Sequence, residues 1–131
     1  PAQIHPDDAK RKAAEVVIDQ PCCMFVKRVT TARPGDKLVV KNPAPVAHNF
    51  HWVSDNNGDH NQTVPKQDQW KFPAPLKAEP GAVQYKCTIH PWMTGYVRIF
   101  DHPYYAVTDE NGNFEIKNAP AGKFRIVYWH E

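Results

Sequence analysis

The fold of this chain is decided by residues 83–100, which read V-Q-Y-K-C-T-I-H-P-W-M-T-G-Y-V-R-I-F. Residues 83–87 have the character of a short strand that leads into a loop, and residues 95–100 that of a strand that leads out of it. The loop between them carries a cysteine, a histidine and a methionine in close succession. We expect this strand–loop–strand unit to hold the three side chains at one end of a two-sheet β-sandwich.

The loop offers three soft or borderline metal ligands, Cys87, His90 and Met93, and His48 lies well upstream. Two histidines and one cysteine in a trigonal arrangement, with a weak axial methionine, form the blue-copper site of electron-transfer proteins. Zinc sites use cysteine, histidine and carboxylate ligands rather than thioether. Haem attachment requires a C-x-x-C-H motif, whereas Ile89 precedes the histidine here. The four residues together predict one type 1 copper ion.

The predicted ligand set also bears on catalysis. The thiolate of Cys87 and the two imidazoles of His48 and His90 suit both oxidation states of copper, and Met93 is the weak axial partner that tunes the reduction potential. These four ligands fill the coordination shell, whereas a catalytic metal site keeps one position open for water or substrate. We therefore predict an electron carrier that cycles between Cu(II) and Cu(I), and not an enzyme.

Two ligand motifs resemble those of a known family. C-T-I-H-P-W-M at residues 87–93 resembles the ligand loop of the cupredoxins, and its short C-x-x-H-x-x-M spacing is most similar to that of the amicyanins. A-H-N-F-H-W at residues 47–52 resembles the family's P-H-N-V-H-F. The resemblance covers residues 15–101 and departs at Ile89, where the family often has proline. It implies an all-β fold, a cupredoxin-like Greek-key β-sandwich.

The resemblance also implies roles for individual residues around the copper ion. By this match His48 is the first imidazole ligand, while Asn49 and Thr88 support the ligands through hydrogen bonds, the asparagine tying the two ligand loops together. His51 follows three residues after His48. Because side chains alternate along a strand, the two histidines are expected to face opposite sides. The remaining histidines stand in turn-like or terminal contexts and are expected to be solvated: His5, His60, His102 and His130.

A docking surface follows from the same family resemblance. The electron is expected to leave through the exposed edge of His90, within a small apolar patch formed by Pro45, Pro91 and Trp92. Trp52 is a further candidate for this patch. Electron-transfer encounters use small, transient interfaces of this kind, so the expected partner is a redox protein that binds around His90.

Length and charge exclude several other classes of protein. The chain has 131 residues, enough for one ordinary domain, and a formal net charge of +2. This balance gives no electrostatic reason to expect nucleic-acid binding. No apolar run is long enough to cross a membrane as a helix.

The expected cellular compartment is extracytoplasmic. Because the sequence begins with Pro1, we expect a targeting segment to be missing. A copper site together with spare cysteines suggests a bacterial periplasm or another extracytoplasmic space.

The chain divides into three predicted parts. Residues 1–14 form an N-terminal extension, a short helix or a solvated tail, with acidic residues ahead of basic ones. Residues 15–101 form the copper-binding domain, and residues 102–131 form a C-terminal β-strand extension packed on the same domain. Within the domain, the strands are expected at residues 15–19, 24–33, 37–42, 48–53, 67–72, 76–79, 83–87 and 95–100, with a polar loop at residues 55–62.

The C-terminal extension has the pattern of β-hairpins. Three segments alternate apolar and polar residues like strands, at residues 104–108, 114–117 and 123–129. D-E-N-G at residues 109–112 supplies a hairpin turn with Asn-Gly where positive φ is needed. A piece this short cannot bury a core alone. We therefore expect it to extend or cover a sheet of the copper domain.

Two further cysteines, Cys22 and Cys23, are adjacent in the sequence. A disulfide between them would be strained relative to ordinary disulfide geometry. On a strand they would face opposite sides, so that one is buried and the other exposed. A second metal site that combines one of them with Met24 is the alternative.

Two other functions fit the same residues. A periplasmic copper-delivery or storage protein would use an exposed, exchangeable Cu(I) site rich in Met and Cys, and the two methionines of this chain argue against it. The other is a β-sandwich module of a larger copper oxidase, in which the copper loop serves as an internal relay.

Overall fold

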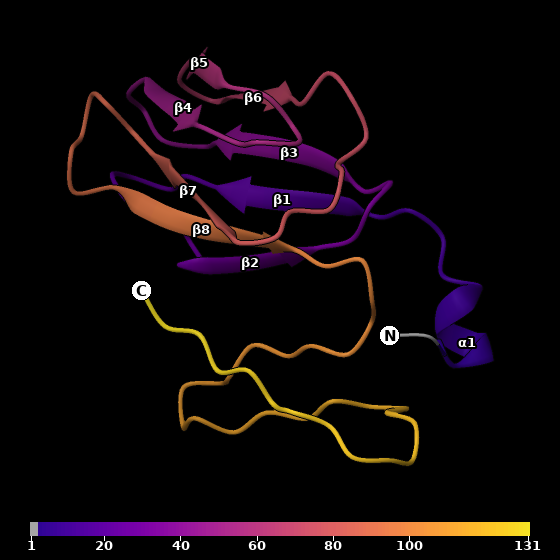
Figure 1. Ribbon diagram of the computed structural model, residues 1–131. Helices are drawn as coiled ribbons and strands as arrows, with labels where there is room; N and C mark the ends of the chain where they lie inside the picture. The colour runs from indigo at the N-terminus through magenta and orange to yellow at the C-terminus, as the bar shows by residue number, and fades with distance from the viewer. Residues whose placement is uncertain (1–2) are drawn as a thin grey trace.

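The computed structural model describes residues 3–131, so residues 1 and 2 of the predicted N-terminal extension lie outside it. The described chain folds into two β-sheets that face each other, with one short helix beside them (Figure 1). Its elements in chain order are α1 (Pro6–Ala9), β1 (Glu15–Asp19), β2 (Val29–Ala32), β3 (Lys37–Asn42), β4 (His48–Trp52), β5 (His60–Val64), β6 (Asp68–Lys71), β7 (Ala82–Lys86) and β8 (Thr94–Ile99). No helix in the described residues is long and apolar enough to cross a membrane.

The two sheets differ in size. The smaller has the strand order β1-β3-β6, and the larger has the order β2-β8-β7-β4-β5. The β1–β3 and β2–β8 pairs are parallel, and the other pairs are antiparallel. Parallel neighbours cannot be joined by a tight hairpin, so the chain crosses from one sheet to the other between β1 and β2 and between β2 and β3. This arrangement confirms the predicted all-β sandwich.

Alternation along the strands builds the core. In β8 every second residue is buried, and in β7 the buried residues are Val83 and Tyr85. The ring of Tyr85 packs against Phe25 and Phe50, with centroids 4.8 and 5.2 Å away. Gly95 lies directly opposite Tyr85, and a Cβ at that position would stand only 2.5 Å from the phenol ring. Glycine is therefore required here, because any side chain would displace the central aromatic residue of the core.

The register of β4 and β7 brings two distant parts of the sequence together. The strands are antiparallel, with His51 opposite Lys86 and Trp52 opposite Tyr85. His48, at the start of β4, therefore lies at the same end of the sheet as Cys87, which follows the last residue of β7. The pairing of these strands thus delivers the upstream histidine to the loop that sequence spacing singled out.

Several predicted strands agree with the structure, and two segments differ. β1 and β3 have the predicted bounds, and β4, β6, β7 and β8 differ from prediction by a residue or so at their ends. The predicted strand at residues 76–79 does not form, since it runs between prolines as an irregular segment. The predicted polar loop at residues 55–62 is shorter than expected because β5 begins at His60. Cross-strand pairing with β4 over five residue pairs, not local polarity, decides that segment.

The predicted strand at residues 24–33 is largely wrong. Only Val29–Ala32 forms β2. The backbone of Cys22, Cys23 and Lys27 lies in the left-handed region, with φ of 28, 65 and 63°. Strand residues need φ near −120 to −140°, so this segment makes a compact turn instead of a continuous strand.

The N-terminal lead-in contains a shorter helix than predicted. α1 spans only Pro6–Ala9, and the chain then runs to β1 without regular structure. The Arg11 guanidinium donates two hydrogen bonds to the Asp36 carboxylate, at 2.7 and 2.8 Å. The same carboxylate accepts the Ala14 and Arg33 backbone N–H groups, each at 2.8 Å. These bonds hold an extended conformation in place of further helical turns.

The C-terminal segment, residues 102–131, differs most from prediction. The Asp-Glu-Asn-Gly turn forms, with the Gly112 N–H 3.0 Å from the Asp109 carbonyl and φ of 82° at the glycine. However, no strand follows Ile99 in the described chain, and Figure 1 shows the segment as an irregular loop that runs beside the sandwich. On β8, to which the segment is connected, both edges are already paired, with β2 and β7. The predicted strands at 104–108, 114–117 and 123–129 are therefore wrong for this structure.

A few aromatic and charged contacts connect this segment to the sandwich. Tyr105 stacks on Phe100 with centroids 4.3 Å apart, and Trp129 packs edge-on against Tyr96 at 5.3 Å. The terminal Glu131 pairs with the guanidinium of Arg28. Most side chains of the segment are exposed. Scattered contacts of this kind place the segment without making it part of either sheet.

Candidate metal centre

Three side chains with metal-binding atoms meet at the end of the larger sheet. The Nδ1 atoms of His48 and His90 lie 3.0 Å apart. The Sγ atom of Cys87 lies 4.0 Å from the first of these nitrogens and 3.8 Å from the second. They form the one such group of three His, Cys, Asp or Glu ligands found among the described residues. The structure therefore brings together three of the four residues that the sequence singled out as metal ligands.

The size of this triangle fits a single metal ion. A point in its plane lies about 2.1 Å from all three atoms, as follows from their mutual distances. Metal–imidazole bonds of about 2.0–2.1 Å and metal–thiolate bonds of about 2.3 Å are of this length. The two imidazole nitrogens and the thiolate would together hold such an ion. This donor set suits copper, which accepts imidazole and soft thiolate together.

Burial prepares the three groups for metal binding. His48 has no exposed surface and Cys87 is 1% exposed, whereas His90 is partly exposed. Burial, and then the charge of His90, lower the pKa of His48. A ligating imidazole must be neutral, so this direction favours metal binding at neutral pH. The Nε2 atom of His48 is also buried and has no hydrogen-bond partner in the described residues, so packing orients this ring.

The loop from Cys87 to Met93 is closed by its own backbone. The Cys87 N–H donates to the Met93 carbonyl at 3.0 Å, and the Met93 N–H donates to the His90 carbonyl at 2.9 Å. Met93 is 1% exposed and belongs to the same hydrophobic cluster as Cys87. The loop is thus anchored at both ends in the core, and His90 lies between the anchors at the surface.

Asn49 connects the two segments that carry the cluster. Its Oδ1 atom accepts the Thr88 backbone N–H at 2.7 Å, and its Nδ2 atom donates to Asn61 Oδ1 at 2.7 Å. The buried Gln20 side chain donates to the Asn49 carbonyl at 3.4 Å. The bridge from Asn49 to the ligand loop has the form that the family resemblance implied. Asn61 and Gln20 are not evident from the sequence, because residues 55–62 have the polar composition of a loop and nothing local links residue 20 to this end of the sheet.

His51 stands apart from the cluster. It pairs with Lys86 in β7 and with Asn61 in β5, and it is half-buried. The His48 imidazole is in contact distance of the cysteine, whereas His51 is outside the group of three. The structure thus brings His48, the histidine that the family resemblance implied, and not His51, to Cys87 and His90.

Several apolar side chains of the two ligand segments are exposed. Pro45, Pro91 and Trp92 are all exposed, and the Trp92 indole is 67% exposed with its ring centroid 5.3 Å from that of His90. Further exposed apolar side chains belong to the same loops: Val46 and Ile89. Trp52, by contrast, is 1% exposed and packs in the core against Phe50 and Phe72, so it cannot take part in a docking surface.

The two adjacent cysteines lie beside the ligand loop. Cys22 is exposed and Cys23 half-buried, and their sulfur atoms are 3.6 Å apart. The Trp92 indole N–H donates to the Cys23 carbonyl at 2.9 Å. The expectation that the two face opposite sides of a strand is wrong, because both residues adopt positive φ within a turn. Sequence alone carried no signal that this turn contacts the loop.

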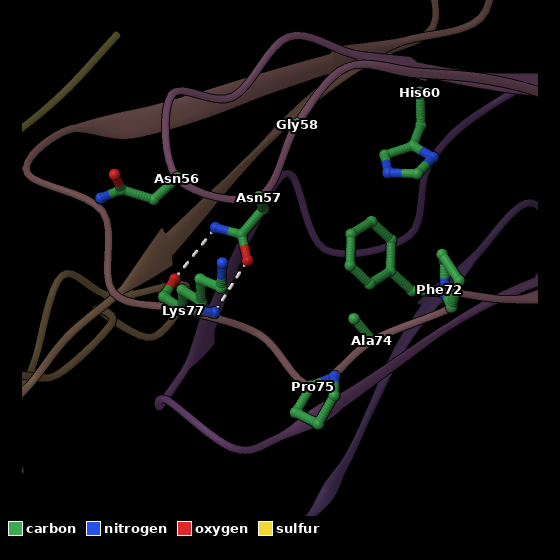
Figure 2. A pocket seen from close by; sticks show the side chains of 9 residues that line it. Asn56, Asn57, Gly58, His60, Phe72, Ala74, Pro75 and Lys77 are labelled. Carbon is green, nitrogen blue, oxygen red and sulfur yellow. Dashed lines mark hydrogen bonds between the residues drawn. The ribbon is translucent and has the colours of Figure 1, made fainter.

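A separate hollow of about 300 Å³ lies near the β5–β6 side of the molecule (Figure 2). Asn57 closes one wall, since its amide exchanges two hydrogen bonds with the Lys77 backbone at 2.7 and 3.0 Å. His60, expected to be solvated, is half-buried, with its ring centroid 4.7 Å from that of Phe72. None of the three clustered ligands lines this hollow. It reflects how the loop before β5 is anchored and is distinct from the metal-binding end.

Comparison with known proteins identifies the fold. No family model matches the sequence, and no curated protein matches it. Among solved structures, a reduced tryptophan-to-tyrosine variant of amicyanin superposes with a TM-score of 0.57 at 23% identity, covering 71% of this chain and 89% of that chain. The Cu(I) form of a methionine-to-alanine variant of amicyanin gives 0.55 at 22% identity, with the same coverage. Amicyanin from Paracoccus versutus gives 0.56 at 22% identity, covering 71% and 88%. This chain therefore has the cupredoxin fold of amicyanin.

Proposed function

We propose that this chain, whose fold is that of a cupredoxin, is a mononuclear blue copper protein that carries single electrons between redox partners. The observation that supports the proposal best is the triangle of His48 Nδ1, His90 Nδ1 and Cys87 Sγ, which matches the dimensions of one ion. Copper in such a site supplies a reversible one-electron couple. Met93, which is buried in the same hydrophobic cluster as Cys87, is the proposed fourth and weakest ligand.

The protein's contribution is to hold these donors still. His48 begins a strand that is paired on both sides, by β5 and β7. The backbone bonds between Cys87 and Met93 fix the loop, and Asn49 ties it to β4. Donors held this firmly move little when the charge of the site changes, so the reorganisation that accompanies electron transfer is small.

The electron is proposed to enter and leave through His90. This is the one residue of the triangle that is not buried, and it lies between the core-anchored ends of its loop. The exposed apolar residues Pro45, Pro91 and Trp92 are the proposed docking patch, and the Trp92 ring lies 5.3 Å from that of His90. A small apolar patch favours brief encounters with a partner protein, because it excludes water without the strong charge pairing that would slow release. The site is proposed to act in a periplasm or another extracytoplasmic compartment.

The proposal is tested by adding one equivalent of Cu(II) to the purified protein and recording its visible spectrum. We expect an intense thiolate-to-copper band in the red that a mild reductant bleaches. His48→Ala should abolish the band, and His51→Ala is the matched control that should keep it, since His51 lies outside the triangle. A pale, weakly bound mixture in the wild type would refute the blue-copper function. Loss of the band in the His51 variant alone would refute the ligand assignment.

A further inference from the structure

We propose that Cys22 and Cys23 form a second, surface binding site for Cu(I), through which copper reaches the buried triangle. This proposal rests on the proposed function for the destination of the ion, but the surface site itself can be tested without it. The two sites would use the same metal for different purposes: one receives the ion, and the other uses it.

The geometry of the cysteine pair is that of a chelate. The two Sγ atoms are 3.6 Å apart on one turn, so both thiols point to the same region of solvent. The turn achieves this by placing both residues at positive φ, 28 and 65°. Non-glycine residues in this region are strained, and such strain is concentrated at functional sites. On an ordinary strand the two side chains would point apart.

The chemistry of the pair selects a soft cation. Two thiolates prefer Cu(I) over hard metal ions. With metal–sulfur bonds of about 2.3 Å, sulfurs at this separation would subtend an angle of about 100° at the ion. That bent arrangement leaves at least one position open to solvent. Met24, the next residue, is 56% exposed and adds a thioether to the same turn. An incomplete and exposed coordination shell is what an exchange site needs, whereas the triangle is enclosed.

The turn is positioned against the ligand loop. The Trp92 indole N–H bonds to the Cys23 carbonyl at 2.9 Å, and the same indole packs beside His90. The hydrogen bond with Cys22, then burial, then the charges of Cys22 and Cys87 raise the pKa of Cys23. Trp92 thus connects the cysteine turn to the partly exposed His90, and this is the side from which a copper ion released from the turn would approach the triangle.

The proposed transfer balances without a redox partner. Binding of one Cu(I) to the two thiols releases two protons and forms two copper–sulfur bonds. Transfer to the triangle breaks these two bonds and forms bonds from copper to Cys87 Sγ, His48 Nδ1 and His90 Nδ1. Cys22 and Cys23 regain two protons, one released by the Cys87 thiol and one taken from water. The copper stays Cu(I) throughout, so neither oxidant nor reductant is consumed. Affinity at the turn should therefore rise with pH.

The first experiment isolates the surface site by removing the buried thiolate. Under anaerobic, reducing conditions, Cys87→Ser is titrated with Cu(I) against a coloured Cu(I) chelator. We expect it to retain one tightly bound equivalent, and adding Cys22→Ser and Cys23→Ser should weaken retention at least tenfold. Equal retention by the two variants would overturn the proposal, as would a Cys22–Cys23 disulfide that persists under reductant. This result does not depend on whether the wild type forms a blue site.

The second experiment tests delivery in the otherwise unchanged chain. Protein lacking metal is mixed with the Cu(I) chelate, sampled over time and oxidised, and the blue band of each sample is measured. We expect the double variant Cys22→Ser/Cys23→Ser to fill the triangle at least tenfold more slowly than the wild type and to reach the same final absorbance. Equal loading rates would overturn the role in delivery. A wild type that never turns blue would instead count against the proposed function, and the first experiment would still decide the surface site.

Discussion

The ligand loop at residues 87–93 and the C-terminal segment at residues 102–131 each contain a tight turn closed by backbone hydrogen bonds. Only the ligand loop is flanked by strands. The loop is closed by backbone bonds of 2.9 and 3.0 Å, and the turn at Asp109 is closed by bonds of the same lengths. The difference lies outside the turns. Cys87 and Met93 are each 1% exposed, whereas Ile126 and Tyr128 are 73 and 81% exposed.

The comparison teaches what a hairpin in this molecule requires. β7 and β8 pair with each other, and each also pairs with a second strand, β7 with β4 and β8 with β2. Both outer edges of the hairpin are therefore hydrogen-bonded to a neighbouring strand. An isolated two-stranded hairpin is marginal in water. The C-terminal segment has correct turn chemistry and alternation but no free sheet edge beside it on β8. Burial and neighbours, more than local pattern, distinguish the two regions.

The largest effect is expected from the buried anchor of the ligand loop. Cys87→Ser should abolish the thiolate-to-copper band completely, because a serine hydroxyl cannot supply the thiolate on which that band depends. Tyr128→Ser, in the C-terminal segment, is the matched control and should leave the band intact. Visible absorption with Cu(II) checks both variants. An undiminished band in Cys87→Ser would mean that another sulfur atom is the copper ligand.

The next effect concerns the N-terminal lead-in, which is anchored in the way the C-terminal segment is not. Asp36→Ala should lower the free energy of unfolding by about 2–4 kcal/mol, since buried donors left without an acceptor cost about 1–3 kcal/mol each and Arg11 retains access to water. Urea unfolding measures this change. Glu131→Gln breaks the exposed pair with Arg28 and should not move the midpoint. An equal shift of the urea midpoint in Asp36→Ala and Glu131→Gln would show that the Arg11–Asp36 and Arg28–Glu131 pairs stabilise the fold equally.

The same carboxylate should make stability depend on pH. Burial alone would raise the pKa of Asp36, but hydrogen bonds from Arg11, Ala14 and Arg33 outweigh it, and the pKa is lowered from 3.8. A lowered pKa means that this stabilisation is fully present above pH 3.8 and is lost as the pH falls through the lower, folded-state value. Urea midpoints between about pH 2 and 5 should fall steeply for the wild type. In Asp36→Ala the fall should be smaller, and an equal slope would contradict the role of this carboxylate.

A smaller effect is expected where the two ligand segments are joined. Asn49→Ala removes the acceptor of the Thr88 N–H and leaves Asn61 without its donor. We expect a loss of about 1–3 kcal/mol in the free energy of unfolding. The blue band should broaden because the loop is held less firmly. Gln62→Ala, on the exposed side of β5, is the control. Unchanged stability together with an unchanged spectrum would show that the backbone bonds alone hold the loop.

The smallest effect is expected in the C-terminal segment. Tyr128→Ser removes a large but mainly exposed ring and should change the free energy of unfolding by less than about 0.5 kcal/mol. Thermal unfolding followed by circular dichroism measures the change. A loss of unfolding free energy comparable to that of Asn49→Ala would mean that the segment packs more closely than the exposure of its side chains indicates. The C-terminal segment and the ligand loop would then differ less in their contribution to stability.

The position of the candidate metal centre was largely predictable from sequence. Cys87 and His90 stand three residues apart, so one turn can aim both at a point, and His48 was found through its neighbours in the motif. The role of Asn49 followed from the same motif. By contrast, Asn61 and Gln20 reach Asn49 through pairings between distant segments, which leave no local pattern.

The sequence by itself determined the strands with strong alternation and the Cys87–His90–Met93 loop, because each depends on spacing within a few residues, and the two ligand motifs pointed to the sandwich. Tertiary structure alone decided that Cys22 and Cys23 share one turn beside the ligand loop, and that the C-terminal segment forms no strands. Both depend on contacts between residues that are far apart in the sequence, such as Trp92 with Cys23 and Trp129 with Tyr96. Such contacts are a property of the whole fold, and no short window of the sequence records them.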